Sequence, residues 1–494
     1  MNKPLRHIAI FCGLLVLALL VRANWIQYAE SDELAKHEKN RRVAIERYAQ
    51  PRGNILVAGK PITGSKAVDG QDFKYKRTFK DGPMYAPITG YSSQAFGSTA
   101  LENLNDELLS GSDDRLFIQN TVNMLTGKSQ RGGDVYTTID PDAQKAAFEG
   151  LGELNLKGGV AAIEPETGKI LALASTPSYD PSSFAGMSTK DGEDEDQWKK
   201  LQADKTKPLL NRALKETYPP GSTFKVLTAA AAIEAGKVTD VNDPTDTPDP
   251  YKLPQTTSPL PNHTEGLPCK NATVKAAMEV SCNTVFAKLA VEVGKEKMRE
   301  VAEGFGFNDG EVDTPIRAGK SIYPSEIDVP QTGLSGIGQG SVTASPLQIA
   351  MLAAGIANDG KVMKPYLVDE LRGPDRDLIA KTEPAERSRP ISADTAAKVR
   401  EAMESTATNG SGRPAVIGNG VTVGAKTGTA QHGANNELPP YAWFISYGKN
   451  SDGKQVAVAV FVDPGQDIPR SDIAGGKLGG PIAKDVMEAV LLKK

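Results

Sequence analysis

The stretch YPPGSTFKVLTAAAAIEAG, residues 218–236, places Ser222 and Lys225 three residues apart where two prolines give way to an alanine-rich run. Proline disfavours a helix interior and alanine is the best helix former, so the stretch predicts a helix over residues 223–235. Residues three apart share a helix face, which brings the lysine amine within reach of the serine hydroxyl. A serine at a helix start also meets unpaired backbone N–H groups and the positive end of the helix dipole.

This pair has a possible chemical use. A serine that attacks a carbonyl needs a base. A lysine can be that base if burial or a second cation lowers its pKa. The alternative is that Ser222 only caps the helix and Lys225 is a surface residue. A serine and a lysine at this spacing, taken alone, favour that alternative.

Two further stretches strengthen the chemical interpretation. Ser281-Cys282-Asn283 puts a hydroxyl and an amide into the apolar segment AAMEVSCNTVFAKLA, and Lys426-Thr427-Gly428-Thr429 lies on the predicted strand VTVGAKTGTA. Alone, the first is ordinary helix-surface polarity and the second a bulge or turn. A glycine inside a strand weakens it unless another backbone must approach closely. Together the three stretches form the Ser-x-x-Lys, Ser-x-Asn and Lys-Thr-Gly set of penicillin-binding proteins and β-lactamases.

Beyond these motifs the chain resembles the class B penicillin-binding proteins, the membrane-anchored peptidoglycan D,D-transpeptidases. The likeness extends from about residue 150 to the end and is weaker upstream. It is carried by PRGNIL, PETGKILALASTPSYDP, GIGQGSVTASPLQIAMLAAGIANDG, and AKTGTAQ followed by YAWFISYG. The short N-terminal region is most similar to the actinobacterial penicillin-binding protein A type.

The resemblance implies a role for each motif residue in the acyl-transfer steps. Ser222 would be the nucleophile that becomes acylated by a stem peptide or by a β-lactam, and Lys225 would be its general base. Ser281 would relay a proton to the leaving amine, and Asn283 would hydrogen-bond the substrate amide. Lys426 would keep Lys225 neutral and attract the substrate carboxylate.

The same resemblance implies the substrate-binding groups. The hydroxyls of Thr427 and Thr429 would bind the carboxylate, with Gly428 between them in the binding strand. The backbone N–H groups of Ser222 and Thr429 would form the oxyanion hole.

The pattern of elements predicts an α+β fold of the penicillin-binding and β-lactamase-like type. The segment GGVAAIEPETGKILALAST reads as a hairpin, helices are expected over 223–235, 273–293, 347–358 and 393–406, and strands over 421–430, 441–448 and 455–463. Strands at both ends that enclose helices indicate one sheet completed by C-terminal strands.

We expect a cytoplasmic tail (1–7), a signal-anchor transmembrane helix (8–28), a small pedestal domain (29–150) and the transpeptidase domain (151–494).

The N-terminus carries the membrane signal. The apolar run from Ile8 to Val21 is fourteen residues long, short of the roughly 20 that span a bilayer. Continuing past Arg22 to Tyr28 completes a span, with the arginine snorkelling and the aromatic residues at the interface. A cleaved signal peptide also fits, because Val21 and Ala23 resemble a small-residue cleavage site. We favour the uncleaved anchor, hence a single-pass protein of the cell membrane with an extracytoplasmic body.

Composition excludes other classes. A chain of 494 residues requires more than one domain, and a net charge of -4 argues against a nucleic-acid binder. Four histidines and three cysteines form no metal-ligating pattern, and no phosphate-binding loop indicates a cofactor. Outside the membrane, Cys269 and Cys282 form either a disulfide or two separate buried thiols, and sequence leaves both open.

Two other kinds of function are compatible with this set of motifs. A β-lactamase or D,D-carboxypeptidase would share the fold, but a class A β-lactamase needs a Glu-x-x-Leu-Asn loop that is missing between residues 283 and 426. A non-catalytic penicillin-binding scaffold is the third interpretation.

The resemblance implies stem peptides, the lipid-linked precursor and β-lactams as ligands. It also implies a polytopic membrane glycosyltransferase and proteins of cell division, elongation or sporulation as partners.

Overall fold

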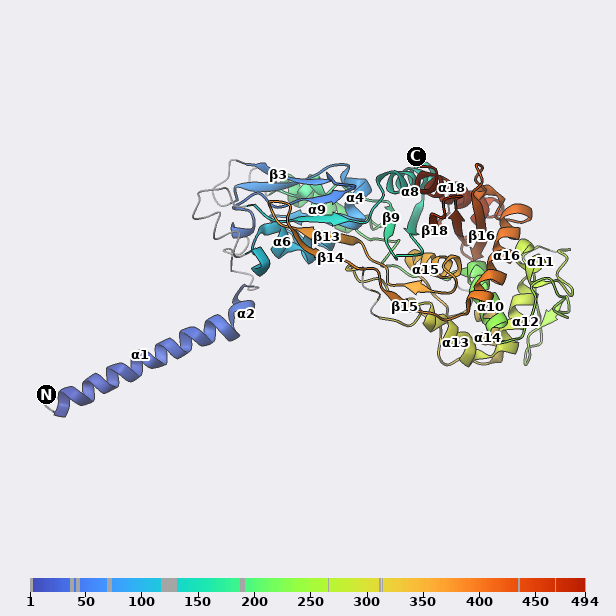
Figure 1. The fold of residues 1–494 in the computed structure, drawn as a ribbon, viewed down its shortest axis with the longest axis horizontal. Helices are drawn as coiled ribbons and strands as arrows, with labels where there is room; N and C mark the ends of the chain where they lie inside the picture. Colours follow the sequence, from blue (N-terminus) through green and yellow to red (C-terminus); the bar gives the residue numbers. More distant parts are fainter. Residues whose placement is uncertain are drawn as a thin grey trace.

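The protein is described from a computed structural model, drawn in Figure 1. The structure describes residues 3–35, 40, 45–68, 73–116, 131–186, 192–264, 266–310, 312, 314–433, 436–466 and 468–493. Met1 and Asn2 of the expected tail and residues 117–130 of the expected pedestal therefore lie outside the described residues.

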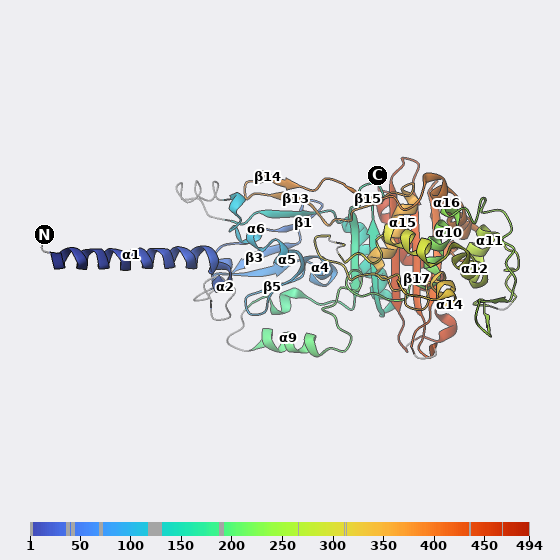
Figure 2. The same cartoon turned by 90° about the horizontal axis from the view of Figure 1, so that it is seen from below.

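Helix α1 (Lys3–Ala29) projects away from the rest of the chain (Figures 1 and 2). It is long and apolar enough to cross a membrane, and none of its residues is buried against the protein. Arg22, near its C-terminal end, donates two hydrogen bonds to the carboxylate of Glu30, at 2.7 and 3.1 Å. The short helix α2 (Ser31–Ala35) follows.

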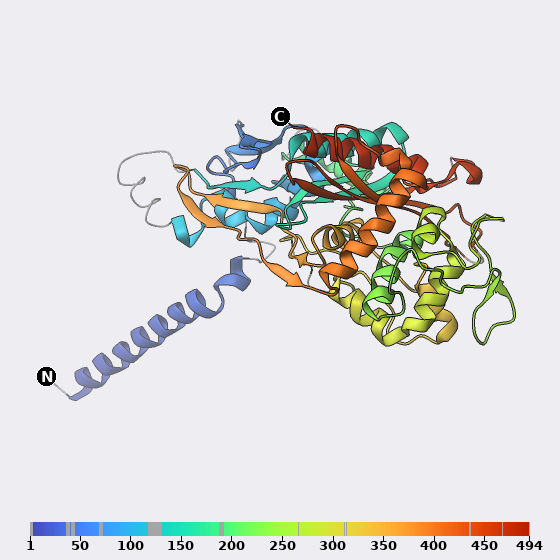
Figure 3. The same cartoon turned by 45° about the vertical axis from the view of Figure 1, so that its right-hand side comes forward.

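The N-terminal region is built on a five-stranded sheet in the order β14-β13-β7-β1-β2. Its strands are β1 (Ile55–Val57), β2 (Lys60–Pro61), β7 (Asp134–Thr137), β13 (Val368–Arg372) and β14 (Leu378–Lys381). The last two come from far along the sequence and reach back as the orange hairpin in Figure 3. The N-terminal sheet is therefore completed by a segment that lies inside the expected transpeptidase range.

Smaller elements surround this sheet. They are the hairpins β3 (Thr63–Ala67) with β4 (Tyr75–Phe79) and β5 (Ser92–Ser93) with β6 (Gly97–Ser98), and the helices α4 (Gly82–Thr89), α5 (Ala100–Leu104) and α6 (Asp106–Ser110). A buried ion cluster ties them together. Glu102 bonds Arg77 Nε at 2.6 Å and Arg52 at 3.2 Å, and all three side chains are at most 1% exposed.

The larger body is built on a second five-stranded sheet in the order β16-β17-β18-β8-β9. Its strands are β8 (Lys157–Ile163), β9 (Ile170–Thr176), β16 (Thr422–Ala430), β17 (Tyr441–Lys449) and β18 (Gln455–Asp463). Helices α8 (Pro141–Leu154) and α18 (Gly480–Leu491) cover one face, and α15 (Pro346–Ala357) covers the other. Burial on both faces explains why the central strands are apolar at nearly every position.

A helical part packs beside β16. It contains α10 (Lys225–Glu234), α11 (Val274–Val280), α12 (Asn283–Val293), α13 (Lys295–Gly304), α14 (Val329–Ser335) and α16 (Ala393–Asn409). Remaining elements are α9 (Glu193–Ala203), α17 (Gly475–Leu478), β10 (Tyr251–Lys252), β11 (Pro259–Leu260), β12 (Val362–Met363) and β15 (Glu386–Ser388). The α+β prediction is confirmed.

One helix prediction is wrong in an informative way. Residues 273–293 were expected to form a single helix, and they form α11 and α12 with a break at Ser281 and Cys282. Ser281 has a left-handed backbone (φ 62°, ψ 47°), which ends α11 as an αL C-cap. A helical period continues on both sides of this break, so the pattern of apolar residues gives no sign of it.

Candidate active site

Ser222 lies on a single 3-10 turn, η3 (Gly221–Phe224), and α10 begins at Lys225. The serine therefore precedes the helix by one tight turn instead of sitting inside its first turn. Gly221 adopts φ 54°, a left-handed conformation that favours glycine, and its N–H donates to Gly338 O at 3.0 Å. This bond fixes the turn against the loop that follows α14.

The other side of the turn is held against the sheet. Trp443 Nε1, on β17, donates to Pro219 O at 2.9 Å. A Cβ added to Gly428 would lie 2.9 Å from Thr223 Cγ2, closer than real Cβ atoms approach, and 3.1 Å from Pro220 O, closer than most do. The glycine of Lys-Thr-Gly thus allows β16 to lie directly against the serine-bearing turn.

The side chain of Lys225 is fully buried beneath the serine. Its Nζ donates to Ser281 O at 2.7 Å and to Asn283 Oδ1 at 2.8 Å, and lies 3.1 Å from Ser281 Oγ. The left-handed backbone of Ser281 turns its carbonyl and its hydroxyl to the same amine. The break in the predicted helix therefore serves to hold Lys225.

A second buried lysine meets the same hydroxyl. Lys426 Nζ donates to Ser281 Oγ at 2.9 Å and to Thr427 O at 2.9 Å, and its side chain is 0% exposed. Burial lowers the pKa of Lys426 to about 7. Burial, and then the positive charge of Lys426, lower the pKa of Lys225 well below that of a free lysine.

These contacts suit a neutral Lys225. A neutral amine has two N–H donors and one lone pair. The two donors match Ser281 O and Asn283 Oδ1, which can only accept. The lone pair is then left for a hydroxyl hydrogen, from Ser281 or from Ser222. Two lysines that share one hydroxyl form a path along which a proton can move.

Asn283 opens α12 and is itself held by the loop that covers this end of the cleft. Asn262 Oδ1 accepts hydrogen bonds from the N–H groups of Asn283 (2.8 Å) and Thr284 (3.2 Å). Cys269 and Cys282 are joined by a disulfide across the same loop. No sequence pattern points to Asn262, because an asparagine in a proline-rich loop has no recognisable partner until the loop has folded.

Thr429 presents its backbone toward the serine. β16 is the edge strand of its sheet, so alternate backbone groups point away from β17. A Cβ at Gly221 would lie 2.9 Å from Thr429 O, which shows that this carbonyl faces the turn. The N–H and C=O of one strand residue point to the same side, so Thr429 N–H also points out from this edge of the sheet.

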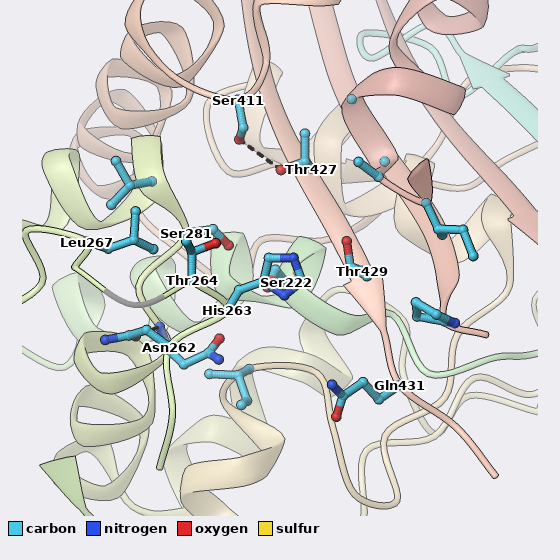
Figure 4. Close-up of a pocket in the computed structure, with 18 of the residues that line it drawn as sticks. Ser222, Asn262, His263, Thr264, Leu267, Ser281, Ser411, Thr427, Thr429 and Gln431 are labelled. Atoms are coloured by element: carbon cyan, nitrogen blue, oxygen red, sulfur yellow. Dashed lines mark hydrogen bonds between the residues drawn. The ribbon is translucent and has the colours of Figure 1, made fainter. Parts of the chain in front are cut away.

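All these groups meet at a cleft of about 1440 Å³ (Figure 4). Ser222, Ser281, Asn283, Thr427 and Thr429 line it, whereas the buried Lys225, Lys426 and Gly428 lie behind this lining. Within the described part of the chain, no three His, Cys, Asp or Glu side chains stand close enough to hold a metal ion.

Comparison with known proteins gives the family. The penicillin binding protein transpeptidase domain matches residues 158–488, and the penicillin binding protein A dimerisation domain matches residues 52–135. The chain belongs to the class B penicillin-binding proteins. The site described above therefore lies within the matched transpeptidase domain.

Several full-length relatives of this penicillin-binding protein are similar to it. Peptidoglycan D,D-transpeptidase PbpA of Mycolicibacterium smegmatis is 40% identical, and that of Mycobacterium tuberculosis 39%, each over 99% of both chains. The structure of penicillin-binding protein A from M. tuberculosis in its ceftriaxone acyl-enzyme complex is 39% identical with a TM-score of 0.84, covering 90% of this chain and 100% of that one. A D,D-transpeptidase domain from Eggerthella lenta, 28% identical, has a TM-score of 0.72 and covers 89% and 98%.

Proposed function

We propose that this chain is a serine D,D-transpeptidase that cross-links peptidoglycan stem peptides through an acyl-enzyme on Ser222. The observation that carries the proposal is the pair of fully buried lysines, Lys225 and Lys426, that both contact Ser281 Oγ below the serine. Two buried amines with lowered pKa values have no structural use that apolar side chains would not serve better.

In the acylation step, neutral Lys225 takes the proton of Ser222 while the serine oxygen attacks the carbonyl between the two terminal D-alanines. The backbone N–H groups of Ser222 and Thr429 stabilise the oxyanion. No hydrogen bond joins Lys225 Nζ and Ser222 Oγ among the described contacts of the substrate-free chain. Substrate-free enzymes commonly hold such pairs apart until substrate binds.

Collapse of the tetrahedral intermediate breaks the bond to the terminal D-alanine, whose nitrogen receives a proton through Ser281 Oγ. The lysines that are hydrogen-bonded to Ser281 Oγ then return a proton to it. D-Alanine leaves, and an amine of a second stem peptide attacks the ester by the reverse route. The new amide bond is the cross-link, and Ser222 regains its proton.

The substrate would lie along β16. We assign the hydroxyls of Thr427 and Thr429 to its carboxylate and the side chain of Asn283 to its amide. In the free chain Asn283 Nδ2 donates to Pro261 O at 2.8 Å, so an incoming carbonyl would replace that bond. Gly428 lets the substrate-binding strand lie close to the serine-bearing turn because it has no side chain. Lys426 attracts the substrate carboxylate by its positive charge.

The comparisons support this assignment. The PbpA relatives that match over their full length are named peptidoglycan D,D-transpeptidases. Penicillin-binding protein A of M. tuberculosis has been solved as acyl-enzyme complexes with ceftriaxone, imipenem and penicillin G. We infer that β-lactams acylate Ser222 in the same manner.

Helix α1 gives the expected location. We infer a single-pass anchor over residues 8–28 with a tail over 1–7, and a pedestal (29–150) and transpeptidase domain (151–494) outside the cytoplasm. Stem peptides and their lipid-linked precursor are found there. A polytopic membrane glycosyltransferase of the division or elongation machinery would supply the glycan. Failure of any such enzyme to co-purify after gentle membrane extraction would count against this partnership.

Intact mass after incubation with penicillin G tests the chemistry, using residues 45–494 and the Ser222→Ala variant. We expect a stable adduct of the drug's mass on the unaltered serine and none on the variant. Rapid drug hydrolysis without an adduct would favour the β-lactamase alternative. Neither adduct nor hydrolysis would favour the scaffold. Release of D-alanine from a stem-peptide donor, without transfer to an added D-amino acid, would indicate a carboxypeptidase.

A further inference from the structure

Ser411 lies in the cleft but in none of the three motifs. It follows the C-terminal end of α16 and lines the same cavity as Ser222. Its hydroxyl is 2.8 Å from Thr427 Oγ1, the contact drawn as a dashed line in Figure 4. Ser411 is exposed to solvent, so this hydroxyl can also reach a bound molecule.

The backbone around Ser411 is held from two sides. Its N–H donates to Glu279 O at 3.2 Å, on α11 two residues before Ser281. A Cβ at Gly410 would lie 2.6 Å from Glu279 O, and one at Gly476 would lie 2.8 Å from Ser411 O. Close packing on both sides fixes the serine between the strand that carries Thr427 and the helix that leads to Ser281.

The electrostatics of this corner favour an anion. The fully buried Lys426 places its Nζ next to this corner, because it donates a hydrogen bond to the backbone oxygen of Thr427 at 2.9 Å. Among the described residues that line the cleft the one carboxylate is that of Glu279, and it accepts a hydrogen bond from Ser405 Oγ on α16. In a pair of bonded hydroxyls, one O–H always remains free to donate.

We propose that Ser411 is a carboxylate-binding residue, which joins Thr427 and Thr429 in the subsite for the terminal carboxylate of the donor stem peptide. When the carboxylate arrives, the two hydroxyls exchange their mutual bond for one bond each to its oxygens. The assignment rests on the proposed function. It adds a residue from a fourth segment to the three motifs.

The test compares penicillin G with its methyl ester, in which the carboxylate is masked, on the full-length protein in detergent. The readout is the second-order rate of adduct formation on Ser222. Ser411→Ala should slow acylation by the acid roughly 10- to 100-fold, the loss expected for a hydrogen bond to a charged group, and leave acylation by the ester nearly unchanged. Ser411→Thr, which keeps the hydroxyl, should retain most of the rate with the acid.

Ser471 provides the matched control, because it also lines the cleft and makes no described bond to Thr427. Ser471→Ala should leave both rates unchanged. The double variant Thr427→Val with Ser411→Ala should slow acylation by the acid less than the product of the two single slowing factors, because the hydroxyls act together.

Equal slowing of acid and ester by Ser411→Ala would mean a structural role and would overturn the proposal, as would no slowing at all. Absence of an adduct with either compound on the unaltered protein would instead overturn the proposed function, and this assignment with it.

Discussion

Gly428 offers a sharp test of how closely the serine-bearing turn must lie against β16. Replacing it with alanine would place a methyl group 2.9 Å from Thr223 Cγ2 and 2.9 Å from Trp443 Cβ. Ordinary carbon contacts are about 3.5–4.0 Å, so each distance is short by roughly 0.6 Å or more. One of the two neighbours must move.

The tryptophan cannot move easily. Trp443 is 0% exposed, is paired within the sheet on β17, and bonds Pro219 O through its indole N–H. The serine-bearing turn moves more easily than Trp443, so the clash should displace Ser222 away from Thr429 by about half an ångström or more. Displacements on this scale cost up to about 100-fold in rate, and overpacking costs about 1–3 kcal/mol of stability.

The assay is the acylation rate with penicillin G, together with the thermal midpoint of unfolding. Gly428→Ala should slow acylation roughly 10- to 100-fold. Adding Thr223→Ser removes the clashing methyl and keeps the hydroxyl that donates to Pro220 O at 2.8 Å, so the double variant should recover part of the rate. Gly418→Ala, where a Cβ meets nothing within 4 Å, is the control. Normal acylation by Gly428→Ala, or no recovery in the double variant, would refute the reasoning.

Four further outcomes follow from the described contacts. Lys426→Met should abolish acylation yet stabilise the fold by about 2 kcal/mol at pH 7. Burial lowers the pKa of Lys426 to about 7, so the folded state binds fewer protons than the unfolded state, a cost of roughly 4 kcal/mol at pH 7 that the two lost hydrogen bonds offset in part. Unfolding measured against pH should show the gain shrink as the pH rises toward 10.5. Glu279→Gln should leave the lifetime of the penicillin adduct unchanged, whereas a slower release measured by mass would make that carboxylate a deacylation base. Glu102→Gln should lower stability by about 3–5 kcal/mol in denaturant titration, since it unbalances a buried ion cluster, while Glu107→Gln should not. Cys269→Ser should cost about 2–4 kcal/mol and loosen the cleft loop, seen as faster proteolysis there; an unaltered cleavage pattern would contradict this.

Much of the fold was predictable because its elements follow local rules. The expected helix at 347–358 is α15 (Pro346–Ala357), and the expected strand at 455–463 is β18 (Gln455–Asp463). The helix at 393–406 is present and continues to Asn409. Apolar periodicity and breaker residues decide such segments, and both are read directly from the sequence.

The parts that sequence reasoning missed depend on contacts between distant segments. No local pattern predicts that β13 and β14 complete a sheet begun three hundred residues earlier, because strand pairing over that distance leaves no trace in composition. The break at Ser281 is hidden for a similar reason. What stabilises its left-handed backbone is the amine of Lys225, 56 positions away along the chain. Ser411 was missed because its partner, Thr427, comes from another segment.

The arrangement around Ser281 explains why the three motifs are found together. A lysine acts as a base only when neutral, and burial near a second cation is what keeps it neutral. A buried amine must still be hydrogen-bonded, or its desolvation is uncompensated. Ser281 and Asn283 supply those bonds to Lys225, and Ser281 also receives the bond from Lys426. Loss of the Ser281 and Asn283 side chains would take hydrogen-bond partners from both buried lysines, so the second motif joins the first and the third in structure as well as in chemistry.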